Sequence, residues 1–202
     1  MGPLSQDAES ARGLRGDDLL RRIRAVAFDD RDAWVDALLG LPDAAPDEAL
    51  PRGGVPYIPC AVAEILDLVR EVPLRPDDVL VDLGAGLGRV LMLAHLLSGA
   101  RGRGVEIQQH LVDAARACAV ARGLSGVTFE QGDAKDATLE GTVFFLYSPF
   151  NGETLQAVLR KLEALAKKQR VTIVSVDLEL PGQSWLNERP VENLALSIYF
   201  SR

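Results

Sequence analysis

An acid and three glycines stand where an apolar strand-like run meets a helix-like one. The run Asp82–Gly88 has the pattern D-x-G-x-G-x-G and follows the apolar residues Val79–Val81. Glycine lets the backbone pass close to a ligand in conformations that a Cβ would obstruct, and the first turn of a helix offers unpaired N–H groups. The segment therefore predicts a cofactor-binding turn. Its expected contacts are Asp82, Gly84, Gly86 and Gly88.

The position after the last glycine separates two cofactor classes. A dinucleotide fingerprint, G-x-G-x-x-G, requires a glycine at position 89, where the chain has Arg89. The pattern thus opposes a nicotinamide-dependent enzyme, an alternative that an NAD titration would test. A glycine turn with a purely structural role in another α/β protein is a second alternative.

Acids also stand at the ends of the next two predicted strands. Glu106 lies 18 positions after Gly88, where a carboxylate can accept hydrogen bonds from both hydroxyls of a ribose. We assign it, with Ile107, to cofactor binding. Asp133 and its neighbour Ala134 follow the third strand, where an acid can accept a hydrogen bond from an exocyclic adenine amine. The alternative for both acids is a surface carboxylate that closes a strand.

These residues meet only if strands and helices alternate along the chain. Strands are expected at 79–83, 103–107, 127–131, 142–148 and 171–176, with two more between 185 and 200. Helices are expected at 89–98, 109–122 and 153–168. Repeated βα units imply a parallel sheet with right-handed crossovers, and such sheets bind ligands beyond the carboxyl ends of their strands. The predicted fold class is α/β, with a doubly wound, mostly parallel seven-stranded sheet.

The residues before the first predicted strand show helical spacing and no strand-like runs. Apolar spacing predicts helices at 17–28, at 32–39 with Gly40 as its stop, and at 61–70, and prolines mark a loop between 42 and 59. We therefore divide the chain into a helical N-terminal extension, residues 1–54, and a cofactor-binding domain, residues 55–202. The extension is expected to serve as a lid over the site or as a dimer contact, and the oligomeric state stays open.

Composition narrows the class of protein. The chain has 202 residues, 48% of them hydrophobic and 25% charged, as in a soluble globular domain. No apolar run approaches the ~20 residues of a membrane-spanning helix, and two cysteines give neither a disulfide framework nor a metal site. Residues 1–50 carry 11 acids and 6 arginines, which disfavours nucleic acid as a partner. We expect a cytoplasmic protein that binds no membrane, no nucleic acid and no metal.

Together these motifs resemble those of class I S-adenosylmethionine (SAM) methyltransferases. The D-x-G-x-G-x-G run is similar to the first motif of that family, and the resemblance extends from about Val55 to Asp177. It implies a Rossmann-like methyltransferase fold in which the last strand inserts antiparallel beside the fifth. It also implies SAM as the cofactor, with the acid and the glycine turn holding its methionine part.

A second resemblance lies just before the first motif. Val55-Pro56-Tyr57-Ile58-Pro59-Cys60 is similar to the P-Y-V-P-T run of small protein lysine methyltransferases. It implies that Tyr57 lines the methyl-transfer site, in catalysis and substrate binding. Cys60 departs from the pattern, in which threonine caps the following helix and can bond to the cofactor carboxylate. The alternative is a proline-stiffened loop with a packing tyrosine.

The third resemblance follows the fourth strand. Ser148-Pro149-Phe150-Asn151 is similar to the N-P-P-F/Y element of amine-directed methyltransferases, with serine in place of the first asparagine. It implies that Ser148 and Asn151 accept hydrogen bonds from the nucleophilic amine and that Phe150 packs against the substrate. Asn151 alternatively caps the helix that begins near Glu153.

The leading hypothesis is a SAM-dependent methyltransferase that acts on the nitrogen of a protein lysine or a small amine. The sequence offers no clear acid or base, because His95 is expected to pack in the core and His110 to lie on the surface. The alternatives are a small-molecule O-methyltransferase and a non-catalytic SAM-fold binding or regulatory protein.

Overall fold

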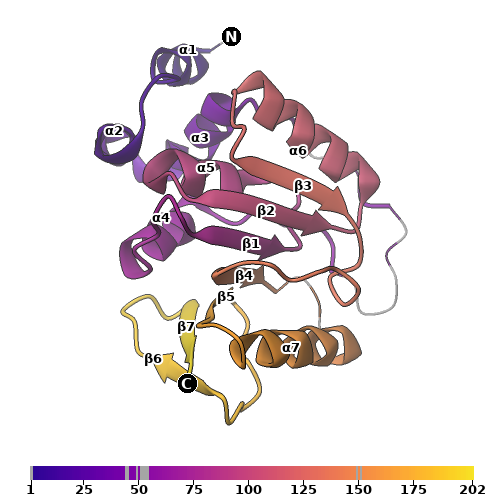
Figure 1. The fold of residues 1–202 in the computed structure, drawn as a ribbon. Coiled ribbons are helices and arrows are strands. Elements are labelled where there is room, and N and C mark those ends of the chain that lie inside the picture. Colours follow the sequence, from indigo (N-terminus) through magenta and orange to yellow (C-terminus); the bar gives the residue numbers. More distant parts are fainter. Residues whose placement is uncertain (1, 44–45, 49, 51–54, 149, 151) are drawn as a thin grey trace.

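A seven-stranded mixed sheet forms the centre of the protein (Figure 1). The computed structural model describes residues 2–43, 46–48, 50, 55–148, 150 and 152–202. The strands are β1 (Val79–Leu83), β2 (Arg101–Glu106), β3 (Val127–Gln131), β4 (Val143–Tyr147), β5 (Thr172–Val176), β6 (Leu186–Arg189) and β7 (Leu196–Ser201). Their order is β3-β2-β1-β4-β5-β7-β6, and β7 runs antiparallel to both of its neighbours. The predicted fold class, including the antiparallel last strand beside the fifth, is confirmed.

Helices cover both faces of the sheet, as a doubly wound fold requires. They are α1 (Pro3–Ser10), α2 (Gly16–Ala25), α3 (Arg31–Leu39), α4 (Val62–Glu71), α5 (Arg89–Ser98), α6 (Gln109–Ala121) and α7 (Gly152–Ala166), with a short 3₁₀ turn, η1, at Phe28–Asp30. The core is accordingly split into two apolar clusters. One joins side chains of α1–α6 to one face of the sheet, and the other packs α7 against the opposite face.

The N-terminal helices are built into the first of these clusters. Ala8 of α1, Leu19 of α2 and Trp34 of α3 are buried with Met92 of α5. The side chain of Trp34 also donates a hydrogen bond from Nε1 to the Asp7 carboxylate, 2.6 Å away. Helices α1–α3 thus share a hydrophobic core with the helices that flank the sheet.

Several predicted helices and strands differ from the structure in their presence or their boundaries. Helix α1 was not expected, since only Ala8 of its residues is buried and it has no apolar stripe. The predicted helix 17–28 is wrong at its end, because Val26 adopts an extended conformation that stops α2 and Phe28 begins a separate 3₁₀ turn. Strand β2 begins two residues earlier than predicted, at Arg101, which pairs in register with Val79.

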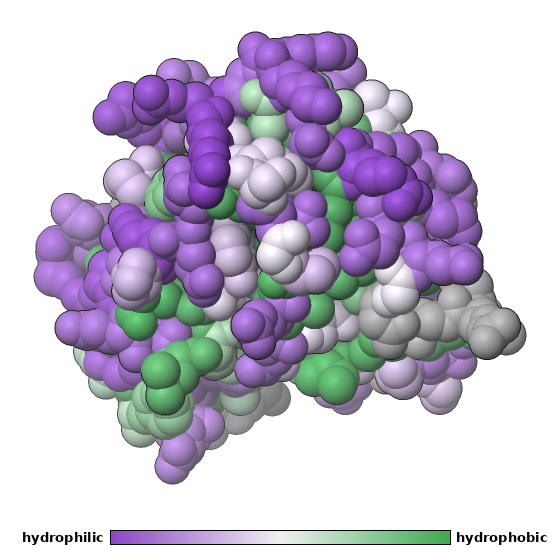
Figure 2. All heavy atoms as spheres, turned by 90° about the horizontal axis from the view of Figure 1, so that it is seen from below, coloured by the Kyte–Doolittle hydropathy of each residue, from purple (hydrophilic) through white to green (hydrophobic). Residues whose placement is uncertain are grey.

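The surface of the described residues is largely hydrophilic. Seen from below the view of Figure 1, polar side chains cover most of the molecule, with apolar ones between them (Figure 2). None of the helices in the described part of the chain is long and apolar enough to span a membrane.

Candidate active site

A cavity of about 260 Å³ lies at the carboxyl ends of the parallel strands. Eight residues predicted from the sequence line it, and they come from the ends of β1, β2 and β4, the segment after β3, and the segment before α4. They are Tyr57, Gly84, Glu106, Ile107, Asp133, Ala134, Ser148 and Phe150. The position agrees with the rule that parallel sheets bind ligands beyond the carboxyl ends of their strands.

Three predicted contacts lie outside the lining of this cavity. Asp82 is buried at the end of β1. Gly86 has a φ of +52° and lies under the ring of Tyr57, where an added Cβ would come within 2.1 Å of the ring. Gly88, with a φ of +79°, packs in the same way on Phe129. One more predicted residue, Asn151, lies outside the described residues.

Glu106 is fixed at the wall of the cavity by two backbone groups. Gly86 N–H donates to its Oε2 and Gln108 N–H donates to its Oε1, each over 2.9 Å. Glu106 is buried, with 7% of the residue exposed. Because each carboxylate oxygen has two lone pairs, it can still accept hydrogen bonds from a ligand in the cavity. The glycine turn thus holds the acid in place.

Asp82 is the most strongly perturbed acid beside the site. Burial, and then the nearby charge of Glu106, raise the pKa of Asp82 from 3.8 to about 8. Near neutral pH the carboxyl group is therefore largely protonated in the absence of a ligand. A cation bound nearby would favour its ionised form, and SAM carries two cationic groups, its sulfonium and its ammonium.

Asp133, the acid after β3, is hydrogen-bonded by Lys135, two residues further on. Asp133 accepts hydrogen bonds from the backbone N–H of Lys135 over 3.1 Å and from its Nζ over 2.7 Å. All three residues from Asp133 to Lys135 line the cavity. The negative charge of Asp133 is consequently balanced by a neighbouring ammonium group.

The segment before α4 is tied to the start of α6. We call residues 46–48 and 55–58, with Leu50, the strap. Asp47 Oδ1 accepts from Tyr57 N–H over 3.0 Å and from Gln108 Nε2 over 2.8 Å, while Glu48 N–H donates to Gln108 Oε1 over 2.8 Å. Glu48 also pairs with His110 Nδ1 at 3.0 Å. The strap is thereby fastened beside Glu106.

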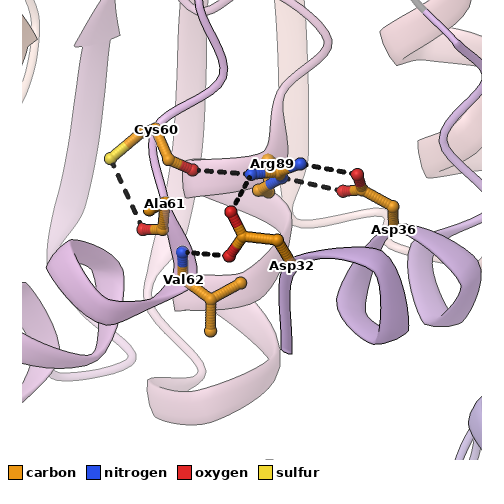
Figure 3. A network of polar contacts seen from close by, with 6 residues as sticks. All are labelled: Asp32, Asp36, Cys60, Ala61, Val62 and Arg89. Atoms are coloured by element: carbon orange, nitrogen blue, oxygen red, sulfur yellow. Dashed lines mark hydrogen bonds and ion pairs between the residues drawn. The ribbon is translucent and has the colours of Figure 1, made fainter. Parts of the chain in front are cut away.

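The residue that breaks the dinucleotide pattern has a structural task. Arg89, at the start of α5, points toward α3 (Figure 3). Its guanidinium donates to both oxygens of Asp36, over 2.7 and 2.5 Å, to Asp32 over 3.4 Å and to the Cys60 carbonyl over 2.9 Å. Burial raises the pKa of Asp36 above its ordinary value, against the lowering effect of Arg89. The arginine joins the glycine turn, α3 and Cys60, just before α4.

Cap chemistry at α4 also departs from the resemblance. Asp32 Oδ1, shown in Figure 3, accepts a hydrogen bond from Val62 N–H over 2.8 Å, a bond of the kind that a capping threonine makes locally. Cys60 is buried, and burial raises the pKa of its thiol. A neutral thiol is a weak hydrogen-bond donor, and the carboxylate of α3 satisfies the helix end instead.

The ends of β4 and β5 form the other side of the cavity. Ser148 Oγ donates to the Asp177 carbonyl over 2.6 Å and lies 3.4 Å from the Val176 carbonyl. Tyr147 and Phe150 add aromatic walls, and Phe150 is buried. Asp177 was not predicted as a site residue, although it follows β5 as Asp133 follows β3. The same strand-end rule would have found it.

The histidines take no part in the cavity lining. His95 Nδ1–H donates a hydrogen bond to the Ala100 carbonyl over 2.7 Å, and the ring packs on Gly126. His110 is partly exposed, and its Nδ1 pairs with Glu48 at 3.0 Å. Within the described residues, no three His, Cys, Asp or Glu side chains are grouped so that they could hold a metal ion.

The structure and sequence have clear relatives. The methyltransferase domain family matches residues 74–192, and no curated protein sequence matches the chain. An RNA methyltransferase from Salinibacter ruber, solved with S-adenosyl-L-homocysteine (SAH), is 30% identical over 71% of this chain and 92% of its own, with a TM-score of 0.57.

Two further solved structures share the fold. A SAM-dependent methyltransferase from Aquifex aeolicus is 15% identical over 68% of this chain and 88% of its own, with a TM-score of 0.53. TrmN from Thermus thermophilus is 22% identical over 67% of this chain and 46% of its own, with a TM-score of 0.52. With the family match over more than half the chain, these findings show that the protein belongs to the SAM-dependent methyltransferases.

Proposed function

We propose that the protein methylates a nitrogen atom, that of a protein lysine or of a small amine. The observation that carries the proposal is the make-up of the cavity at the ends of β4 and β5. Tyr57, Tyr147 and Phe150 supply aromatic walls, and Ser148 and Asp177 supply oxygen acceptors. An amine N–H needs such acceptors, and no group in the described lining resembles the histidine or metal site that would activate an oxygen nucleophile.

The chemistry depends on obtaining a neutral amine. With a reference pKa near 10.4, only about one lysine in 10³ is neutral at pH 7. An aromatic, poorly solvated cavity lowers an amine pKa, because it disfavours the charged form. Ser148 directs its proton at the Asp177 carbonyl, so its lone pairs stay available to accept from the amine. SAM supplies an electrophilic methyl group, and the walls orient the nitrogen toward it.

The same reasoning assigns the cofactor side of the cavity. Glu106 and Ile107 would hold the ribose, Asp133 and Ala134 the adenine, and Asp82 with the glycine turn the methionine part. The cavity wall supports this assignment, since a buried carboxylate held by two N–H groups faces a glycine-lined opening. We assign Asn151 to the amine only on the resemblance.

We treat residues 1–54 as an extension that reaches the site through Leu50. Leu50, a described residue of this extension, lies in the cavity lining, which supports a lid rather than a dimer contact. Cys60 and Cys118 are buried free thiols, and this supports a reducing compartment such as the cytoplasm.

RNA is the second candidate substrate, because the relative from Salinibacter ruber is an RNA methyltransferase. The charges of the lining oppose it. Glu106, Asp133 and Asp177 line the cavity with Lys135, which is already paired with Asp133. A phosphate backbone requires free cationic groups.

Methyl transfer from tritium-labelled SAM distinguishes these candidates. Purified protein would be offered a lysine-containing peptide mixture, a set of alkylamines, total RNA, and phenol and carboxylate acceptors. We expect label on amine nitrogen alone, located by mass spectrometry. Label on RNA or on an oxygen acceptor, with none on amines, would overturn the proposal.

A further inference from the structure

Two residues of the described chain have an unusual backbone conformation. Ser148 has a φ of +39° and Asp177 a φ of +50°, and they are the non-glycine residues with positive φ within the described ranges. Both follow directly on adjacent parallel strands, since Tyr147 at the end of β4 pairs with Val176 at the end of β5. L-residues avoid this region, and those that adopt it concentrate at functional sites.

Hydrogen bonds hold the two residues in this conformation. Ser148 Oγ donates to the Asp177 carbonyl over 2.6 Å. On its other side, Asp177 N–H donates to the Ala195 carbonyl over 2.9 Å, just before β7. The backbone of Asp177 is thus held from both neighbouring strands, and its exposed side chain lies at the cavity mouth.

Within the described residues, Asp177 differs from the other strand-end acid of the cavity in its ion pairing. Asp133, the other acid that follows a strand here, pairs with Lys135 at 2.7 Å. Among the described residues no ion pair is formed by Asp177. Burial raises the pKa of Tyr147 above its ordinary value, and the negative charge of Asp177 adds to that effect, which places the Asp177 carboxylate in electrostatic reach of the aromatic wall.

We propose that Asp177 selects cationic substrates: its carboxylate binds the ammonium group of an alkylamine at the mouth of the methyl-transfer cavity. Ser148 acts as the positioning residue that holds Asp177 there. The inference rests on the proposed amine methylation and narrows it. The preferred substrate is an amine that is positively charged in solution, such as a lysine side chain, in contrast to a neutral aromatic amine.

The test compares two probes that differ in charge. Nα-acetyl-lysine amide is cationic at pH 7.5, whereas trifluoroethylamine is largely neutral. Asp177→Asn removes the charge and keeps a residue that tolerates positive φ. Glu179→Gln is the matched control, because it removes an exposed acid two positions further on that does not line the cavity. Kinetics with each probe would be measured at low and high salt, and SAH affinity by calorimetry.

We expect Asp177→Asn to raise KM for the lysine probe about tenfold or more, as loss of a charge-assisted hydrogen bond implies. The KM for trifluoroethylamine should rise much less than the KM for lysine, because the asparagine amide oxygen still accepts a hydrogen bond from a neutral amine. The SAH affinity and every parameter of Glu179→Gln should stay within about twofold. Salt should raise the wild-type KM for lysine and have little effect in the variant.

Two outcomes would overturn the inference, and they are distinguishable. If the wild type methylates both probes and Asp177→Asn changes their KM equally or not at all, Asp177 does not select charge, while amine methylation stands. If the wild type binds SAH yet methylates no amine and instead methylates an oxygen acceptor or RNA, the proposed function and the inference fail together.

Discussion

Replacing Asp82 with asparagine should stabilise the cofactor-free protein at neutral pH. Asp82 is 2% exposed at the end of β1. Burial, followed by the charge of Glu106, raises its pKa from 3.8 to about 8. Asparagine has nearly the same shape and does not ionise. The variant therefore loses the free-energy cost of protonating the carboxyl group when the chain folds at neutral pH.

The sign and size of the effect follow from proton linkage. A carboxyl group with a higher pKa in the folded state binds more protons when folded, so its contribution to stability falls as pH rises from about 4 to about 8. At pH 7, about 3 units above the unfolded pKa, the loss is at most about 4 kcal/mol at 1.36 kcal/mol per unit. Between pH 5 and pH 7 it grows by about 3 kcal/mol.

Urea unfolding at several pH values between 5 and 8, without SAM, measures this contribution. The difference in free energy of unfolding between the variant and the wild type should widen with pH, since other titrating groups affect both proteins alike. Asp136→Asn, at an exposed position, is the control and should show no widening. A difference that stays constant with pH, or a variant less stable than the wild type at pH 7, would mean that folding does not raise the pKa of Asp82.

Three further substitutions test the surroundings of the site. Gly86→Ala forces an unfavourable φ and displaces the aromatic ring above it, so SAH affinity should fall at least tenfold while Gly182→Ala, which meets nothing within 4 Å, leaves it unchanged in calorimetry. Arg89→Met breaks the pairs with Asp36 and should lower the free energy of unfolding by about 3 kcal/mol, measured in urea. Asp47→Asn weakens the strap's bonds and should speed SAH dissociation several-fold in stopped-flow fluorescence.

Each of these has a contrary result. Equal SAH affinity in the two glycine variants would mean that the turn does not hold the cofactor. A stable Arg89→Met protein would mean that the network in Figure 3 contributes little, and an unchanged SAH release rate in Asp47→Asn would mean that the strap does not cover the bound cofactor.

Strands buried in a parallel sheet were predictable because their sequences are short apolar runs bounded by turn residues. Val79–Leu83 is such a run and matches β1 at both ends. Val127–Gln131 also matches β3 at both ends, but it alternates, with Val127 and Phe129 buried. Helix α1 was not predictable in this way, since its attachment depends on Asp7 receiving a hydrogen bond from Trp34, 27 positions away. The polar residues of α1 show no apolar periodicity that would indicate a helix held by this hydrogen bond.

In the site, too, residues with a local sequence pattern were predictable and contacts between distant residues were not. Glu106 and Asp133 were found because strand-end acids have a recognisable spacing, and Tyr57 because of a resemblance. Arg89 was noted only as a missing glycine, and its partner Asp36 lies 53 positions earlier. The contact between Asp47 and Gln108 spans 61 positions. Contacts of this kind depend on how the helices pack, and a pattern of neighbouring residues does not encode them.

A crystal structure of the complex with SAH would test whether the cofactor binds in the described cavity, because it locates SAH relative to the lining residues. We expect the ribose hydroxyls on the Glu106 carboxylate, the adenine beside Asp133 and Ala134, and the sulfur facing Tyr57 and Ser148. SAH bound away from Glu106, or with its sulfur turned from the ends of β4 and β5, would contradict this expectation.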